Sequence, residues 1–271
     1  MDSRTRPSRH GLVLLWITLA VALVCSSLAV IGVLSGAQAA IGCLPLAVVI
    51  AFGVAIPRSG VFAQPVLAVR TARRELALTF DDGPDPRWTP ALLDLLDARG
   101  HRATFFVIGA RAEKYPALLR DVARRGHELA NHTWSHSYCT VFYSPASLAS
   151  ELRRTNQLLE AASGRVPRWF RPPVGLLSPR VPLGVRLAGL ELVGWTATAR
   201  DGVAGTSAIG ALARLAPAVL PGSILAMHDA PIRGDDRPLI IDDLMKQLLD
   251  LMDETGLKSV TLSELCADDR R

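Results

Sequence analysis

The chain opens on a long apolar region and continues as short apolar runs that alternate with amphipathic stretches. From Gly11 to Pro57 no Asp, Glu, Lys or Arg occurs over 47 residues, and a small polar break at 35–38 divides the region in two. Each half is close to the ~20 apolar residues that cross the hydrocarbon core of a bilayer. The pattern therefore predicts two transmembrane segments, at about 11–34 and 39–57.

Two other interpretations of this region compete with a membrane hairpin. The first segment could be a cleaved signal peptide, because the small residues at 37–39 resemble a cleavage site, although the apolar core is longer than the usual ~7–15 residues. Both segments could instead be buried helices of a soluble fold, which the lack of any charge argues against. We favour the hairpin.

The excess of positive charge in the chain lies on either side of the two segments. Basic residues lie outside both segments and none lies in the link between them: Arg4, Arg6, Arg9, Arg58, Arg70, Arg73 and Arg74. The positive-inside rule then predicts a multi-pass protein of the cell (inner) membrane with its remaining chain in the cytoplasm, an extracytoplasmic domain being the alternative. Residues 75–271 carry 23 basic and 24 acidic side chains, so the net charge of +5 arises at the flanks. The charge distribution excludes nucleic acid as a partner and favours a lipid bilayer.

The second part of the chain predicts an α/β domain. Apolar runs suitable for strands lie at 76–80, 103–108, 128–131, 169–171, 190–195, 224–228 and 259–262. Helical spacing separates them, with a good helix start at Ser144 and good helix ends at Gly164 and Gly256. This alternation is typical of parallel strands with helical crossovers, in a barrel or a doubly wound sheet. We expect a tail at 1–10, a linker at 58–73, the domain at 74–265 and a tail at 266–271.

Polar residues follow the predicted strands, where α/β folds collect their function. Adjacent Asp81 and Asp82 could form a simple turn, but two carboxylates after an apolar strand are electrostatically unfavourable without a cation. His132 and His136 could be structural, yet residues four apart share one face if the segment is helical, a common arrangement of metal ligands. Further candidates at strand ends are Arg171, Asp201 and His228. We interpret His101 and His127 as structural, because they lack such partners.

Together these residues suit one chemistry. Two imidazoles and one carboxylate fit a catalytic Zn²⁺-like ion that keeps open positions for water. A second carboxylate could take the proton of that water, an arginine could hold this base ionised, and a separate histidine could protonate a leaving group.

Five motifs, in this order, resemble the NodB-homology polysaccharide deacetylases of carbohydrate esterase family 4. They are Thr79–Pro84, His132–His136, Arg171–Gly175, Asp201 and Leu225–His228, and the resemblance covers roughly 74–265. It implies a distorted (β/α)7 barrel, here preceded by two transmembrane helices. It also implies a hydrolase that acts on non-peptide amide C–N bonds.

The resemblance implies a role for each motif residue. Asp81 would be the general base, with Arg171 as its partner, and His228 the general acid, tuned by Asp201. A divalent metal, Zn²⁺ or else Co²⁺, Mn²⁺ or Ni²⁺, would activate water. Its ligands would be Asp82, His132 and His136. Val174 would offer a backbone N–H to the oxyanion, and Leu225 would line the pocket for the acyl methyl group.

Two positions depart from the family pattern. An aromatic residue usually stands where Val174 is, and Trp usually stands where Gly202 is. Because both changes remove groove walls, we expect a substrate unlike a plain chitin chain, either an amino-sugar glycan or a lipid-linked saccharide. Two other functions remain: a catalytically silent glycan-binding or scaffold protein, and a metal phosphoesterase, for which a second set of ligands is not found.

Overall fold

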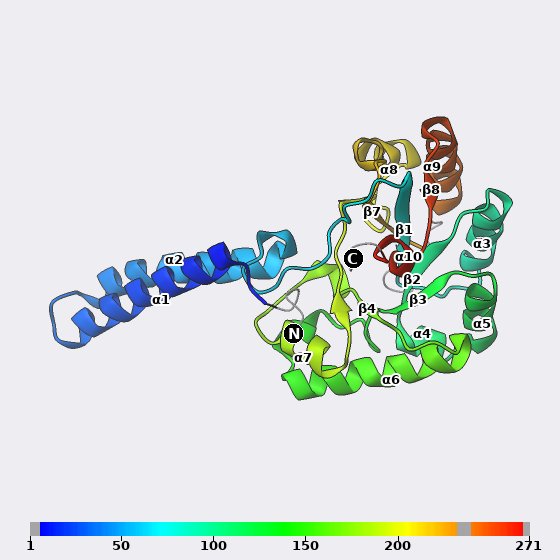
Figure 1. Ribbon diagram of the computed structural model, residues 1–271. Helices are drawn as coiled ribbons and strands as arrows, with labels where there is room; N and C mark the ends of the chain where they lie inside the picture. Colours follow the sequence, from blue (N-terminus) through cyan, green and yellow to red (C-terminus); the bar gives the residue numbers. More distant parts are fainter. Residues whose placement is uncertain (1–5, 232–239, 268–271) are drawn as a thin grey trace.

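The computed structural model describes residues 6–231 and 240–267 of the chain. Two long helices, α1 (Arg9–Val30) and α2 (Gly36–Ala55), form an antiparallel hairpin that projects away from the rest of the protein (Figure 1). Ser8 caps α1, and Ser35 with Gln38 forms a capping box on α2. By length and composition both helices are candidates for membrane spans. Only 11% of each apolar window is buried, so they are not core helices of a soluble fold.

In the described residues after the hairpin, eight parallel strands form a curled sheet. Strand β1 (Glu75–Asp81) is central and pairs with β2 (Ala103–Val107), β7 (Ile224–His228) and β8 (Lys258–Ser259). The strand order is β5-β4-β3-β2-β1-β7-β6, with β8 added beside β1. The remaining strands are β3 (Glu128–Asn131), β4 (Trp169–Phe170), β5 (Glu191–Leu192) and β6 (Ala197–Thr198). This curled α/β architecture is the predicted barrel fold.

Helices cover the outer face of the sheet. The principal ones are α3 (Thr89–Ala98), α5 (Pro116–Arg124), α6 (Pro145–Ser163), α7 (Val181–Leu187), α8 (Ala208–Leu215) and α9 (Ile241–Thr255). Shorter helices are η2 (Pro57–Ser59), α4 (Gly109–Ala112), η3 (Tyr138–Phe142), η4 (Pro173–Gly175), η5 (Ala216–Ala218) and α10 (Leu262–Leu265). Gly164 and Gly256 end α6 and α9 in left-handed conformations, as expected for helix C-caps.

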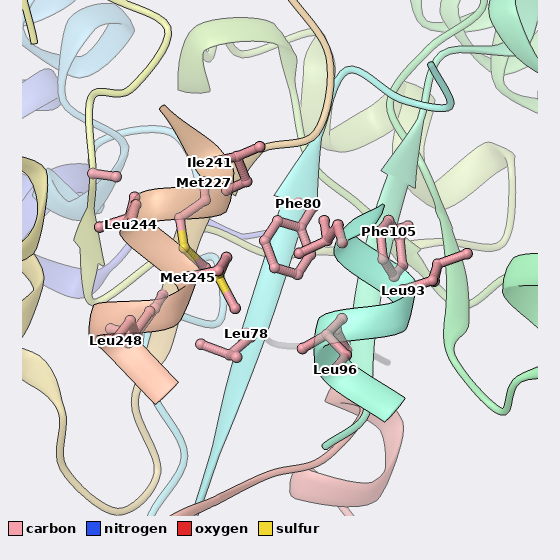
Figure 2. Close-up of a cluster of buried hydrophobic side chains, with 14 of the residues drawn as sticks. Leu78, Phe80, Leu93, Leu96, Phe105, Met227, Ile241, Leu244, Met245 and Leu248 are labelled. Carbon is pink, nitrogen blue, oxygen red and sulfur yellow. The ribbon is translucent and has the colours of Figure 1, made fainter. Parts of the chain in front are cut away.

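The largest core lies between the sheet and helices α3 and α9 (Figure 2). Leu78 and Phe80 of β1 point into it, and the Phe80 and Phe105 rings stack with centroids 5.2 Å apart. Because side chains alternate along a strand, Thr79 and Asp81 point to the other face. Asp81 therefore points away from this core, toward the interior of the curled sheet.

The segment that follows the hairpin packs against the barrel. Val61, Phe62 and Ala63 are buried in a second core, together with Val49 of α2 and Leu192 of β5. Further along, Val66 forms a parallel bridge to Val193, and Ala68 an antiparallel bridge to Ser223. The region expected to be a linker is thus part of the wall of the barrel.

Two predicted strands differ from the observed ones. The apolar run at 190–195 predicts one strand, but only Glu191–Leu192 (β5) forms there and pairs with β4. Strand β6 (Ala197–Thr198), which no predicted run contains, pairs with β7 at the opposite edge of the sheet. The chain passes between the two edges within a few residues because the sheet curls. The run at 259–262 ends as a strand at Ser259, since Thr261 and Glu264 form a capping box that starts α10.

Candidate active site

Three side chains with metal-binding atoms meet at one end of the sheet. Asp82 follows β1, whereas His132 and His136 follow β3. The Nε2 atoms of His132 and His136 lie 3.4 Å and 3.1 Å from Oδ1 of Asp82. One ligand atom from each residue lies within 4.8 Å of the others. The predicted ligand set is therefore brought together in space.

The two histidines converge through a loop and not through a helix face. Thr133 and His136 have positive φ values of 68° and 51°. Oδ1 of Asn131 accepts a hydrogen bond from the Thr133 N–H (2.9 Å), and Oγ1 of Thr133 accepts one from the His136 N–H (2.9 Å). Such side-chain bonds to nearby backbone groups favour turns over helix. The helical explanation of the four-residue spacing was wrong, although the two side chains do meet.

The chemistry of this cluster fits a divalent cation. Within residues 6–231 and 240–267, neither carboxylate oxygen of Asp82 accepts a hydrogen bond, although the side chain is buried. Nδ1 of His132 lies 2.7 Å from the carbonyl oxygen of Arg171, which can only accept, so Nδ1 carries the hydrogen and Nε2 is the free ligand atom. A buried carboxylate without a donor is costly unless a cation faces it.

The electrostatics favour the ligand forms of these side chains. Burial alone would raise the pKa of Asp82, but the imidazoles of His132, His228 and His136 outweigh it and lower the pKa to about 2. Burial and the neighbouring His132 lower the pKa of His136 to about 4. Asp82 is thus ionised and His136 neutral near pH 7, as metal ligation requires.

Asp81 has a different environment from its neighbour. Nη1 of the fully buried Arg171 donates to Oδ1 of Asp81 (2.7 Å) and to Oγ1 of Thr79 (2.8 Å), and Nη2 donates to the carbonyl of Gly194 (2.7 Å). The guanidinium carbon also lies 4.1 Å from the centroid of the Phe106 ring. These contacts fix the arginine, which in turn holds a carboxylate at the edge of the cavity.

His228 at the end of β7 is held by one carboxylate. Oδ1 of Asp201 lies 2.7 Å from Nδ1 of His228, and Oδ2 accepts from the His228 backbone N–H at 2.8 Å. Burial opposes protonation of the imidazole, but Asp201, then Asp82 and Asp81, outweigh it and raise its pKa to about 10. His228 is therefore a cation at neutral pH, with Nε2 turned away from Asp201.

A cavity of about 310 Å³ joins these groups. Its lining includes Asp81, Asp82, His132, His136, Val174, Ala226 and His228. Leu225, which was predicted to line the acyl pocket, is fully buried in the core next to the helices and does not line this cavity. Side chains alternate along β7, so Ala226 faces the cavity in its place. The N–H of Val174, whose φ is 46°, donates to no other backbone group in the described ranges.

Several residues at the site were not singled out from sequence. Nη1 of Arg111 donates to the carbonyl of Asp82 (2.8 Å). The carboxyl of Asp229 is buried beneath Gly83, where an added Cβ would lie 2.2 Å from its Oδ2. Burial raises the pKa of Asp229 to about 7, and its Oδ2 accepts from Thr89 at 2.6 Å. The only sequence signal for Asp229 was its position next to His228.

His101 and His127 are structural, as predicted. Nδ1 of His101 accepts from the N–H of Ser259 (3.0 Å), and Nδ1 of His127 accepts from the N–H of Ala103 (3.2 Å). Both bonds hold the backbone of a strand in place, and neither histidine lines the catalytic cavity.

Comparison with known proteins identifies the family of this chain. The family model described as polysaccharide deacetylase matches residues 68–193. A peptidoglycan-N-acetylglucosamine deacetylase of Bacillus cereus is 35% identical over 197 residues, which cover 70% of this chain and 87% of that protein.

Two solved structures extend the comparison. A family 4 acetyl xylan esterase from Clostridium thermocellum, solved with a cobalt ion, has a TM-score of 0.61 and 34% identity over 71% of this chain and 90% of that one. A pseudoenzyme of family CE4 from Bacillus anthracis shares the fold, with a TM-score of 0.65 and 22% identity over 74% of this chain and 68% of that one. The chain belongs to the polysaccharide deacetylase family, the NodB-homology hydrolases of carbohydrate esterase family 4.

Proposed function

We propose that this protein is a membrane-anchored, metal-dependent hydrolase that removes an N-acyl group, the N-acetyl group in particular, from an amino sugar. The substrate class is a glycan or a lipid-linked saccharide. One observation carries the proposal: a single cavity is lined by Asp82, His132 and His136, by Asp81, which pairs with Arg171, and by His228, which pairs with Asp201. The relative from Bacillus cereus, named for N-acetylglucosamine of peptidoglycan, supports the substrate chemistry.

Asp82, His132 and His136 would hold the metal ion, for which Zn²⁺ suits two imidazoles and one carboxylate. Co²⁺, Mn²⁺ and Ni²⁺ are the alternatives. When bound, the ion supplies Lewis acidity to the substrate carbonyl and acidifies water.

The other residues move protons and hold charge. Asp81 takes the proton of the attacking water, and Arg171, at 2.7 Å, holds this carboxylate in position. His228 donates a proton from Nε2 to the departing amine, because Asp201 engages Nδ1 and maintains the cation. The backbone N–H of Val174 stabilises the oxyanion of the tetrahedral intermediate.

We also propose the domain arrangement and the membrane location. The two apolar helices anchor the chain, and the arginines at the open end of the hairpin favour a cytoplasmic catalytic domain. Alkaline phosphatase fused after Arg271 should be inactive in this topology and active if the domain is exported. β-Galactosidase fused at the same position should give the opposite result.

The decisive experiment measures metal and turnover on the same sample. Full-length protein in detergent micelles should contain one divalent ion per chain and release acetate from N-acetylglucosamine oligomers. Chelation should abolish turnover, and added Zn²⁺ or Co²⁺ should restore it. Protein that binds no metal and releases no acetate would instead be a silent glycan-binding member of the fold.

A further inference from the structure

A second cavity of about 380 Å³ lies between the open end of the helix hairpin and the catalytic barrel. Ala55 of α2, Ile56 and Pro57 form one wall, and Leu192, Val193 and Trp195 lie on the barrel side. Four residues line both this cavity and the catalytic one: Gly175, Trp195, Thr198 and Arg200. The two cavities are therefore adjacent and share a wall.

Three arginines line the second cavity, namely Arg58, Arg200 and Arg214. In the part of the chain that the structure describes, none of them forms an ion pair with a carboxylate. Nη2 of Arg58 donates to the carbonyls of Trp195 and Thr196, and Nη1 of Arg214 donates to that of Gly210. A guanidinium has five N–H donors, so these bonds fix Arg58 and Arg214 and still leave donors for an anion.

The hairpin also contacts the loop that carries the proposed oxyanion donor. The N–H of Leu177 donates to the carbonyl of Val54 in α2 (3.2 Å). A Cβ placed on Gly175 would lie 3.5 Å from Cγ of Pro57. If α2 crosses a bilayer, the second cavity therefore opens where this helix leaves the lipid, directly beside Val174.

The lining of this cavity favours an amphiphilic anion. Three cationic side chains suit phosphate oxygens, and the apolar wall next to the end of α2 suits hydrocarbon. A neutral glycan would bring no negative charge to pair with the guanidinium groups. Gly202 and Val174 line the catalytic cavity without an aromatic ring, so Trp195, which also lines the second cavity, is the ring in its lining that can stack on a sugar.

We propose that the second cavity binds the phosphate or diphosphate group that joins an amino sugar to a membrane lipid, while the N-acyl group of that sugar enters the catalytic cavity. This inference rests on the proposed deacetylase function and selects one of its two substrate classes. The arginines act as specificity-determining residues, and the lipid chain remains near the end of α2.

The test compares three probes on metal-loaded, full-length protein in detergent micelles. They are N-acetylglucosamine diphosphate linked to a farnesyl chain, N-acetylglucosamine 1-phosphate, and a neutral N-acetylglucosamine tetramer. We expect the highest kcat/KM for the lipid-linked probe. Arg58→Gln, Arg200→Gln and Arg214→Gln should each lower this value about tenfold or more relative to that for the tetramer, as expected on loss of a hydrogen bond to a charged group. Arg→Lys at each position should retain more of it.

Arg120→Gln is the matched control, because Arg120 is an exposed arginine of α5 outside both cavities. It should leave all three probes unaffected. A preference for the tetramer, or equal losses on all probes in the arginine variants, would overturn the inference and leave the deacetylase in place. Equal turnover of the lipid-free phosphate and the lipid-linked probe would overturn the lipid part. If no probe is hydrolysed, the proposed function itself fails. Binding of the lipid-linked probe, carrying a fluorescent label, to Asp81→Asn protein then still tests the cavity.

Discussion

Two carboxylates that are neighbours in the sequence lie in opposite surroundings. Asp81 faces the buried guanidinium of Arg171, whereas Asp82 faces two imidazoles and accepts no hydrogen bond in the described ranges. The resemblance of the motif assigns different roles to the two residues, and the structure gives them different surroundings. The partners of Arg171 at Thr79 and Gly194 could not be predicted, because they depend on how distant strands pack.

Asp81→Asn should lower turnover about 10²–10⁴-fold, the usual contribution of general acid–base catalysis, and should leave the metal content near that of the wild type. Asp82→Asn should lose the metal as well. Asp243→Asn, an exposed position of α9, serves as the control and should change neither. Acetate release and metal content are measured on each protein. Equal metal loss in both site variants would contradict the assignment of the two aspartates.

Asp201→Asn should lower the pKa of His228 from about 10, because the carboxylate is the main stabiliser of the imidazolium. Only the protonated imidazole can donate to the amine, so activity should fall at a lower pH in the variant. The pH profile of kcat tests this. An unchanged alkaline limb would show that another group is the acid.

The same ion pair links stability to pH. The pKa of His228 is higher in the folded protein than its ordinary value of 6.5, so the folded state binds this proton more tightly. The stabilisation is complete below about pH 6.5 and fades as the pH rises toward 10. The difference in free energy of unfolding between wild type and Asp201→Asn should therefore shrink over this range, as denaturant unfolding can show.

At the scale of elements, periodicity predicted where strands exist better than where they pair. Most apolar runs became strands, but the run at 190–195 forms only β5, and the chain then crosses to the opposite edge of the sheet, where the unpredicted β6 pairs with β7. A window of sequence carries no signal for such a transfer, which the curl of the whole sheet determines. The helix considered for the segment after β3 was wrong for a local reason, since the Asn131 and Thr133 side chains accept hydrogen bonds from nearby backbone N–H groups and favour a turn.

Asn131→Ala should weaken both the fold and the metal site. The amide accepts from Thr133 and donates to the carbonyl of Leu152 and to Asn156, so its loss leaves buried groups unpaired, at a cost of about 1–3 kcal/mol. Metal affinity should fall, because the loop positions both histidines. Asn156→Ala removes only one of these bonds and should leave metal affinity unchanged. Thermal unfolding and zinc titration distinguish the two variants.

At the scale of the whole molecule, the helix hairpin is docked on the barrel and is more than a tether. A Cβ on Gly53 of α2 would lie 2.7 Å from Cγ1 of Val61, and one on Gly11 of α1 would lie 2.5 Å from the carbonyl oxygen of Gly60. Helix α1 therefore lies against the backbone at 60–61, and α2 lies against the Val61 side chain. The apolar length of the helices was evident from sequence, but this docking was not.

Gly53→Val should separate α2 from the barrel, because overpacking at such a contact costs about 1–3 kcal/mol. We expect a lower melting temperature in micelles and faster proteolysis near Arg58. Gly36→Val is the matched control in the same helix, since a Cβ there meets nothing within 4 Å. Equal behaviour of the two variants would mean that the hairpin does not dock.

The segment that bridges Val66 to Val193 and Ala68 to Ser223 has a consequence for biogenesis. It fills the gap left where β5 and β6 part, so the barrel wall is completed by the residues translated just after the second apolar helix. Val66 and Ala68 leave the ribosome early, but their partners are made only with residues 193 and 223. A version of the protein that starts at Arg74 will lack both of these bridges.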